Sequence, residues 1–311
     1  MHPHANPKEK RKMKKNTAGR DIAAAAVLAV AAAIAPVARS KAQIVSIVPD
    51  EDVAKIEKIA GDTFGERAKD SKKPRILVFF KCEGFCHNRA ISYGLKALET
   101  ASRKGAFSMD ATADYGFLSA GRLAGYDGLV LLNCTNPDTK NHPNLEKDLV
   151  NFVKGGKGLC VVHAGCDGFY DAPEASDMIG GRFWDHPWSY GPMWSIENVK
   201  PEHPVNRAFK SEGLVFKRKE EIYQHSTPPY DPSKVQVLLS LDLKDEATAA
   251  RFAEYKGHKR DDGQFPVSWV KEYGKGRVFY TTLGHESNTY VDPASLGHIF
   301  DGLRWTLGEI H

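Results

Sequence analysis

The chain contains little cysteine, which limits the ways in which it can be stabilised. Five of its 311 residues are Cys, too few for a fold of this size that is built on disulfide bonds. Hydrophobic residues make up 41% of the chain and charged residues 26%, a balance typical of globular proteins. We therefore expect a hydrophobic core that is stable without cross-links.

Signatures of several other protein classes are also missing. No glycine-rich loop of the dinucleotide-binding type follows the first predicted strand, so no nucleotide cofactor is expected. The apolar stretch 22–37 is too short to span a bilayer comfortably. No Cys follows that stretch at a lipid-attachment position, and the sequence has no Arg-Arg pair of the twin-arginine type of export signal.

The N-terminus instead has the order of segments found in a secretory signal peptide. Basic residues crowd positions 8–15, the apolar stretch 22–37 follows, and Ser40 and Ala42 supply small residues at positions −3 and −1 of a cleavage site. We expect residues 1–42 to be a signal peptide and the mature protein to be periplasmic or extracellular, with no stable membrane anchor after cleavage. The alternative is an alanine-rich helix on a cytosolic protein.

The positive charge of the chain lies in this N-terminal segment. Residues 1–42 hold nine Lys or Arg and two Asp or Glu, a net charge of +7, whereas the whole chain carries +4. The mature part is therefore at −3. Nothing in the charge of the mature part suggests a nucleic-acid-binding surface, so nucleic acid is not expected as a partner.

The middle of the sequence alternates between predicted strands and helices. Continuous apolar runs at 75–81, 126–133 and 158–163 are typical of strands buried on both faces. Apolar residues recur with helical spacing at 87–103 and 143–154. This alternation predicts an α/β fold with three layers, α/β/α, around a mostly parallel sheet.

Other segments flank this alternation. The further predicted elements are a helix within 50–68, a strand at 107–112, a hairpin of strands 266–271 and 276–281, and a closing helix at 296–307. Residues 43–74 form a polar lead-in before the domain. The stretch 167–235 is rich in Gly, Pro, Trp and His and has no clean periodicity, so we expect a loop-rich insertion with a functional role.

Histidines follow three of the predicted strands. His87 comes shortly after the first strand, His163 stands at the end of the strand 158–163, and His285 follows the hairpin. In open α/β sheets, ligands bind outside the carboxyl ends of the strands, where these side chains should converge. A single histidine in such a place is more often a capping or core residue, but three at equivalent positions indicate a functional site with His163 at its centre.

The insertion adds groups of other chemical kinds. Arg182 offers a planar fork of hydrogen-bond donors, and Asp185 and His186 offer proton transfer or metal ligation. Trp184 offers a flat apolar face that suits a sugar ring, with core packing as the alternative. Glu221 has three interpretations: a base, a ligand or a solvated charge.

Five segments of the sequence together resemble one protein family. They are GFCH at 84–87, GLCVVHAG at 158–165, GGRFWDHP at 180–187, EEIY at 220–223 and PVSWVKEYGKGRVFYTTLGHE at 266–286. On these segments the chain resembles the ThuA-like (trehalose utilisation) family over roughly 75–308. The resemblance implies the flavodoxin-like fold of class I glutamine amidotransferases, a ThuA-like domain at 75–311 and carbohydrate metabolism, with a trehalose-like sugar or a keto-sugar as the small-molecule partner.

The resemblance also gives His163 a definite place. Amidotransferases of this fold carry a nucleophilic Cys in the sharp turn after the equivalent strand, and here His163 occupies that position. Cys160 and Cys166 lie three residues away on either side. Imidazole cannot replace a thiolate nucleophile without a change of reaction class, so glutaminase activity is not expected.

Three hypotheses remain open for the site. The first is acid/base chemistry on a carbohydrate, with His163 as the general acid/base and His87 and His285 as its partners. Its substrate-binding residues would be Arg182, Trp184, Asp185, His186 and Glu221. The second is a divalent-metal site, made by two or three of the histidines with Asp185 or Glu221. The third is a non-catalytic module that binds a sugar or a partner.

The cysteines allow two interpretations. Cys82, Cys134 and Cys166 all follow predicted strands, and Cys86 lies close by in the sequence. In an oxidising compartment a Cys82–Cys134 or Cys86–Cys134 bridge would form. The alternative is that all five are buried thiols.

Overall fold

The computed structural model describes residues 46–65, 73–258 and 263–311. The predicted signal peptide at 1–42 lies outside these residues. The described part begins with the predicted lead-in helix, α1, which spans Asp50–Phe64. None of the helices in these described ranges combines the length and the apolar character needed to cross a membrane.

A nine-stranded sheet forms the centre of the fold, in the order β2-β1-β3-β4-β11-β10-β9-β6-β7. The first five strands of this order are parallel to one another: β2 Ser108–Thr112, β1 Arg75–Phe79, β3 Gly128–Leu132, β4 Gly158–Val162 and β11 Gly276–Thr281. The other four pair antiparallel: β10 Pro266–Tyr273, β9 Gln236–Leu241, β6 Met193–Asn198 and β7 Val215–Lys219. The predicted α/β class and the predicted hairpin, now β10 and β11, are confirmed.

The parallel strands send alternate side chains into two separate cores. In β3, Val130 and Leu132 belong to one core cluster, and Leu129 and Leu131 belong to the other. Strands β1 and β4 alternate in the same way. Both faces of these strands are buried, which is why the sequence shows continuous apolar runs there rather than a period of two.

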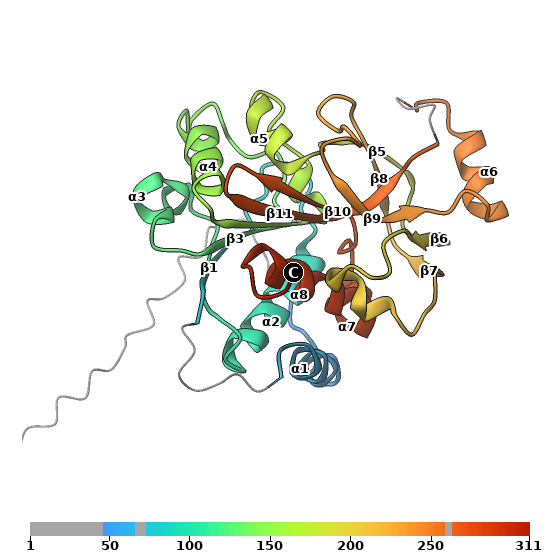
Figure 1. Ribbon diagram of the computed structural model, residues 1–311, viewed down its shortest axis with the longest axis horizontal. Coiled ribbons are helices and arrows are strands. Elements are labelled where there is room, and N and C mark those ends of the chain that lie inside the picture. The colour runs from blue at the N-terminus through green and yellow to red at the C-terminus, as the bar shows by residue number, and fades with distance from the viewer. Residues whose placement is uncertain (1–45, 66–72, 259–262) are drawn as a thin grey trace, which may run out of the picture. The chain divides into compact units, whose positions relative to one another are not determined.

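Helices cover both faces of the parallel strands, and the three-layer arrangement is visible in Figure 1. One face is covered by α1, α2 Asn88–Arg103, α7 Ser287–Val291 and α8 Pro293–Thr306. The opposite face is covered by α3 Ala120–Leu123, α4 Leu145–Lys154 and α5 Pro173–Ile179. Because the helices lie on the faces of the sheet, the loops that follow the strands are not covered by them. These loops can therefore form a site at the edge of the sheet.

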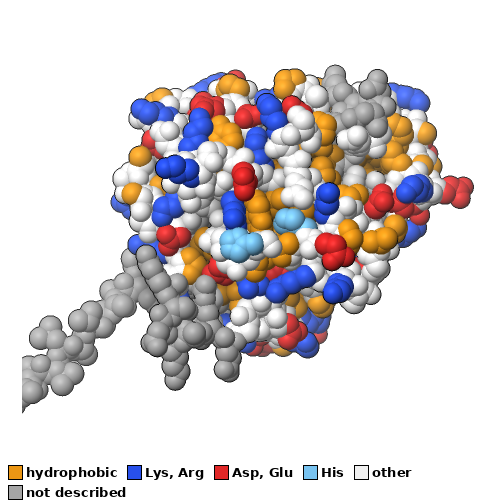
Figure 2. Space-filling model, in the orientation of Figure 1, with side chains coloured by type: hydrophobic (Ala, Val, Ile, Leu, Met, Phe, Trp, Pro, Cys, Tyr) orange, Lys and Arg blue, Asp and Glu red, His pale blue; other side chains and the backbone are white. Residues whose placement is uncertain are grey.

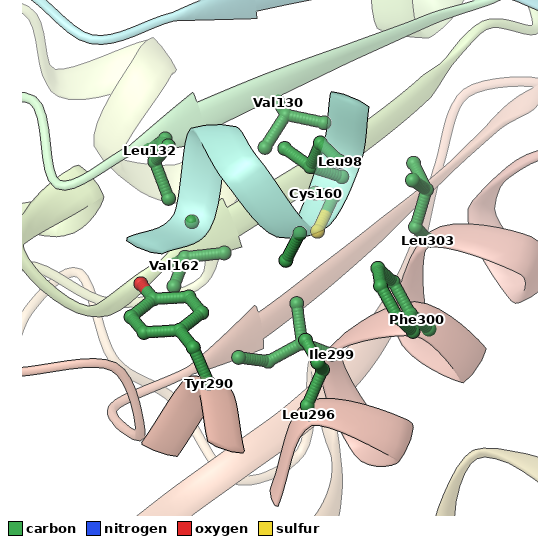
Figure 3. Close-up of a pocket in the computed structure, with 12 residues that line it drawn as sticks. Leu98, Val130, Leu132, Cys160, Val162, Tyr290, Leu296, Ile299, Phe300 and Leu303 are labelled. Carbon is green, nitrogen blue, oxygen red and sulfur yellow. The ribbon is translucent and has the colours of Figure 1, made fainter. Parts of the chain in front are cut away.

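The core under α2 is closely packed. Figure 3 shows side chains of α2, α7 and α8 meeting those of β3 and β4 around a cavity of about 10 Å³, roughly the space of one water molecule. Gly94 brings α2 close to the sheet, because a Cβ atom there would lie 2.7 Å from Cδ1 of Leu132. The lining is apolar except for the hydroxyl of Tyr290 and the thiol of Cys160, so this cavity belongs to the core.

The insertion at 167–235 keeps long loops, as predicted, and it also contains regular elements that its sequence did not indicate. Besides α5 it contains β6 and β7, which extend the main sheet, and a small two-stranded sheet of β5 Phe183–Trp188 and β8 Ile222–His225. Two register shifts interrupt the pairing of β5 with β8, and the alternation of less and more exposed side chains along β5 breaks at Pro187 and Trp188, which are both buried. That irregularity removed the periodic signal from the sequence.

The surface charges are mixed. On the face shown in Figure 2, Lys and Arg side chains are interspersed with Asp and Glu side chains. Charges of both signs so close together give no large field of one sign on this face.

Candidate functional site

The three strand-end histidines lie together at the carboxyl edge of the parallel strands. The ring centroids of His87 and His163 are 4.9 Å apart, those of His87 and His285 are 5.1 Å apart, and those of His163 and His285 are 5.3 Å apart. Each ring comes from a different strand end: β1, β4 and β11. The parallel sheet therefore brings together residues that are far apart in the sequence.

His163 is held in one orientation by its backbone and by one hydrogen bond. It directly follows β4 and has a φ of +48°, in the left-handed region, where the chain turns sharply into the short 3-10 helix His163–Cys166. Its Nδ1 lies 2.5 Å from the carbonyl oxygen of Thr282. A carbonyl oxygen only accepts hydrogen bonds, so Nδ1 carries a proton, and Nε2 faces Oε2 of Glu221 at 3.5 Å.

Small residues make the sharp turn after β4 possible. A Cβ atom at Gly165 would lie 2.6 Å from the carbonyl oxygen of Leu131, so the chain can pass β3 at this distance only with glycine. Gly284 has a φ of +129° and lies across from His163, whose Cβ would be 3.4 Å from a Cβ atom at 284. The two glycines let the loops that carry His163 and His285 approach each other.

Glu220 holds the loop that carries His285. Its buried carboxylate accepts hydrogen bonds from the backbone N–H groups of Gly284 (3.1 Å) and His285 (3.3 Å) and from the hydroxyl of Thr289. Burial raises the pKa of Glu220, although these donors and His163 act in the opposite direction. Glu220 therefore fixes the backbone from which the imidazole of His285 projects.

Glu221 lies among the histidines, just before β8. Its Oε2 is 3.5 Å from Nε2 of His163 and 3.7 Å from Nε2 of His285, and its Oε1 is 3.4 Å from Nδ1 of His186. Burial raises the pKa of the Glu221 carboxyl, but His163, His285 and His186 together outweigh burial and hold the pKa below its usual range. Glu221 is therefore an ionised carboxylate in contact with imidazole rings at neutral pH.

We call His87, His163, Glu221 and His285 the His–Glu cluster. Each residue offers one donor atom, and all four atoms lie within 4.8 Å of one another. Within the described part of the chain, Nδ1 of His87, Nδ1 of His285 and Nε2 of His163 are buried and make no hydrogen bond. Buried nitrogen atoms that lack a hydrogen-bond partner need an explanation, and a bound cation supplies one for an atom that holds a lone pair.

The electrostatics of the His–Glu cluster keep two of its imidazoles neutral. Burial, reinforced by the neighbouring histidines, lowers the pKa of His87 to about 2. Burial and His163 lower the pKa of His285 to about 4, although Glu221 opposes this shift. A neutral imidazole is the form that binds a metal ion, and it is not a general acid at pH 7.

The remaining predicted site residues differ in whether they contact the cluster, and the printed contacts of Arg182, Trp184 and Asp185 lead away from it. His186 is half-exposed and contacts Glu221. Asp185 accepts hydrogen bonds from the hydroxyl of Tyr255 and the backbone N–H of His186, so its carboxylate is directed toward α6, Glu246–Glu254, and the segment after it. Trp184 donates to the carbonyl of Gly257 and is half-exposed. The guanidinium of Arg182 lies 5.2 Å from the ring of Tyr170.

Several residues of the site were not singled out from the sequence. Tyr223 packs on His163, with ring centroids 4.4 Å apart, and Tyr190 packs on His285 at 4.9 Å. Phe85 packs on His87 at 4.9 Å, and 71% of its surface is exposed. Phe85, Tyr223 and Glu220 do occur in the quoted segments GFCH and EEIY, but no pattern in one sequence distinguishes them from packing residues.

Comparison with known proteins identifies the family. A family model described as trehalose utilisation, ThuA, matches residues 75–306. The chain belongs to the ThuA family. The resemblance inferred from the five sequence segments is thereby confirmed. The comparison with curated proteins gives no match.

Solved structures share the fold of this ThuA chain. One is a ThuA-like protein from Bacteroides uniformis, 22% identical with a TM-score of 0.60, and the match covers 79% of this chain and 97% of that one. Another is a ThuA-like protein from Parabacteroides merdae, 18% identical with a TM-score of 0.53, covering 77% and 92%. At these identities the likeness shows the fold alone, so the chemistry must be argued from the residues of the site.

Proposed function

We propose that this ThuA-family protein is a divalent-metal-dependent enzyme that acts on a carbohydrate. The observation that carries the proposal is the convergence of four donor atoms, from His87, His163, Glu221 and His285, within 4.8 Å of one another. Imidazole and carboxylate ligands bind zinc and similar divalent ions at about 2.0–2.2 Å. Inward movements of about 1 Å would bring all four donors to one ion of this kind.

The low pKa values of His87 and His285 favour this function over acid/base chemistry by the same residues. Neutral imidazoles with buried, unused nitrogen atoms suit ligands better than they suit proton donors. The hydrogen bond from Nδ1 of His163 to the carbonyl of Thr282 supports the same role, because it fixes the tautomer that presents Nε2. We therefore assign the three histidines as ligands and leave proton transfer to groups at the edge of the cluster.

His186 is the group best placed for that transfer. Its side chain is 46% exposed and its Nδ1 lies 3.4 Å from Oε1 of Glu221, so it faces both solvent and the cluster. When bound, the metal ion would polarise a carbonyl or hydroxyl oxygen of the substrate. Glu221 would orient His186 toward that oxygen through Oε1, while Oε2 faces the other ligands.

The surroundings support a sugar as the substrate. Phe85 and Tyr190 pack on His87 and His285 and place aromatic rings beside the cluster, where a sugar ring could lie against them. Arg182, Tyr230 and Lys234 line a separate open pocket of about 490 Å³, to which no residue of the His–Glu cluster contributes. This volume is within the range of small-molecule sites. The family description, trehalose utilisation, points to the same substrate class.

Turnover with and without metal tests the proposal. The purified protein is stripped with a chelator, reloaded with one divalent metal at a time, and assayed with trehalose and with keto-disaccharides. We expect turnover that disappears on stripping and returns with metal. Equal turnover by the stripped protein would support His-based acid/base chemistry instead, and saturable sugar binding without turnover would support the binding module.

We also propose that residues 1–42 direct export, so that the enzyme acts outside the cytoplasm. The order of basic, apolar and small residues supports this proposal. Expression of the full chain in a bacterial host, followed by fractionation and N-terminal sequencing, tests it. We expect a mature chain that begins at Gln43 in the periplasm or medium. A full-length chain that stays in the cytosol would contradict the proposal.

A further inference from the structure

Two cysteines come unusually close together in the loop between β1 and α2. The Sγ atoms of Cys82 and Cys86 lie 2.7 Å apart. Even carbon atoms, which are smaller than sulfur, touch without bonding only at about 3.5–4.0 Å, and a disulfide bond measures about 2.05 Å. The two bridges considered from the sequence both used Cys134, whereas the structure brings Cys82 to Cys86.

The backbone of the loop holds the two sulfur atoms in this position. The N–H of Glu83 donates to the carbonyl oxygen of Thr135 (3.0 Å), and the N–H of Gly84 donates to its hydroxyl oxygen (3.2 Å). That hydroxyl donates in turn to the carbonyl oxygen of Phe85 (2.9 Å). These three hydrogen bonds anchor the loop to the segment after β3. The cysteines are therefore brought together by contacts that do not depend on a bond between them.

Solvent exposure also distinguishes Cys82 and Cys86 from the other cysteines. Cys82 and Cys86 are both partly exposed, whereas Cys134, Cys160 and Cys166 are each only 1% exposed. A small oxidant in solution can therefore reach the first two thiols but not the other three. Sequence separation also favours the pair, because only three residues lie between the two cysteines.

We propose that Cys82 and Cys86 are a site of oxidative modification, where a small-molecule disulfide such as oxidised glutathione forms an intramolecular disulfide bond. One protein sulfur attacks the glutathione disulfide and releases one glutathione thiol, leaving a mixed disulfide. The second protein sulfur then displaces the other glutathione. The two protein sulfurs are oxidised, the two glutathione sulfurs are reduced, and the two protein thiol protons end on the released glutathione thiols.

This modification goes beyond the proposed metal-dependent activity and does not depend on it. The bond closes a small ring whose last member, Cys86, directly precedes His87, and Phe85 projects from within the ring. Closing the ring removes conformations from the unfolded chain and from the loop. Oxidation therefore fixes the backbone that presents His87 to the cluster and Phe85 to solvent.

Peptide mapping of the wild-type protein tests the proposal without any variant. The protein is incubated with oxidised glutathione, remaining thiols are alkylated under denaturing conditions, and peptides are analysed by mass spectrometry. We expect one peptide that contains unalkylated Cys82 and Cys86 and has lost two hydrogen atoms, with Cys134, Cys160 and Cys166 alkylated. A Cys82–Cys134 link, stable glutathione adducts, or alkylation of all five cysteines would overturn the proposal.

Two variants sharpen the test. In Cys134→Ser the bridge should form as in the wild type, whereas in Cys86→Ser it cannot form. We expect oxidation to raise the thermal midpoint of the wild type and of Cys134→Ser by roughly 3–6 °C. Cys86→Ser should show no such rise. An equal rise in Cys86→Ser would show that another pair is responsible, and would contradict the assignment even if that variant is less stable.

Discussion

The Oε2 atom of Glu221 lies 3.5 Å from Nε2 of His163. These residues come from two separate sheets: His163 follows β4 of the nine-stranded sheet, and Glu221 precedes β8 of the two-stranded sheet. The insertion therefore does more than cover the strand ends. It supplies the carboxylate that completes a set of nitrogen and oxygen donors.

Glu221→Gln should weaken metal binding and leave the fold intact. The carboxamide is nearly the same size as the carboxylate, but it is neutral and is a much poorer ligand for a divalent ion. We expect the dissociation constant for zinc to rise by at least about tenfold, a loss of about 1.4 kcal/mol or more of binding free energy. Competition with a chromophoric chelator measures this constant. Glu272→Gln, at an exposed position on β10, is the matched control and should bind zinc like the wild type.

Glu220→Gln should affect metal binding only indirectly, by shifting the loop that carries His285, because Glu220 contacts the backbone of that loop. Glutamine keeps one acceptor oxygen, but its amide N–H group would face the N–H groups of Gly284 and His285. We expect a loss of about 1–3 kcal/mol in the free energy of unfolding, measured in urea, and weaker zinc binding. If both quantities matched those of the wild type, Glu220 would have no role in holding the loop.

His298 should make the protein sensitive to acid by a route that is independent of the His–Glu cluster. It is fully buried, with Nδ1 3.0 Å from the carbonyl oxygen of Val205 and Nε2 3.0 Å from Oγ of Ser268. Burial lowers its pKa from 6.5 to about 3. Between these values the unfolded chain binds one more proton at this residue than the folded chain. Stability therefore falls as the pH falls, by about 1.4 kcal/mol per pH unit.

The variant His298→Gln removes this proton uptake. It should be less stable than the wild type at pH 7, because its amide cannot reproduce both hydrogen bonds. Its free energy of unfolding should nevertheless fall less steeply than that of the wild type between pH 6 and pH 4. The two slopes should differ by nearly the value for one bound proton, about 1.4 kcal/mol per pH unit. His311→Gln, at an exposed position, is the control. A slope for His298→Gln equal to that of the wild type would show that His298 is not the residue responsible.

The sequence predicted the parallel part of the fold well because burial on both faces leaves a direct signal. The apolar runs that became β1, β3 and β4 have no polar side chain in their strands apart from Arg75 at the exposed start of β1, and the helices between them have clear spacing. The insertion gave no such signal, because the pairing of β5 with β8 is irregular and its aromatic residues, such as Trp188, are packed in a core of their own.

The site was predictable in part for the same reason. Their places after predicted strands alone indicated that His87, His163 and His285 would converge, and in the structure each follows a parallel strand. The place of Glu221 depends on how β8 packs beside that sheet, and no local pattern encodes this packing. The approach of Cys86 to Cys82 likewise depends on hydrogen bonds to Thr135, which lies far along the chain.

The metal content of the purified protein tests the central proposal most directly. Elemental analysis is carried out after reconstitution with zinc and removal of the excess, for the wild type, His163→Ala and the exposed control His311→Ala. We predict about one zinc ion per chain in the wild type and in His311→Ala, and almost none in a folded His163→Ala variant. A wild type that retains no metal, or a His163→Ala variant that retains a full equivalent, would contradict the assignment of the His–Glu cluster as a metal centre.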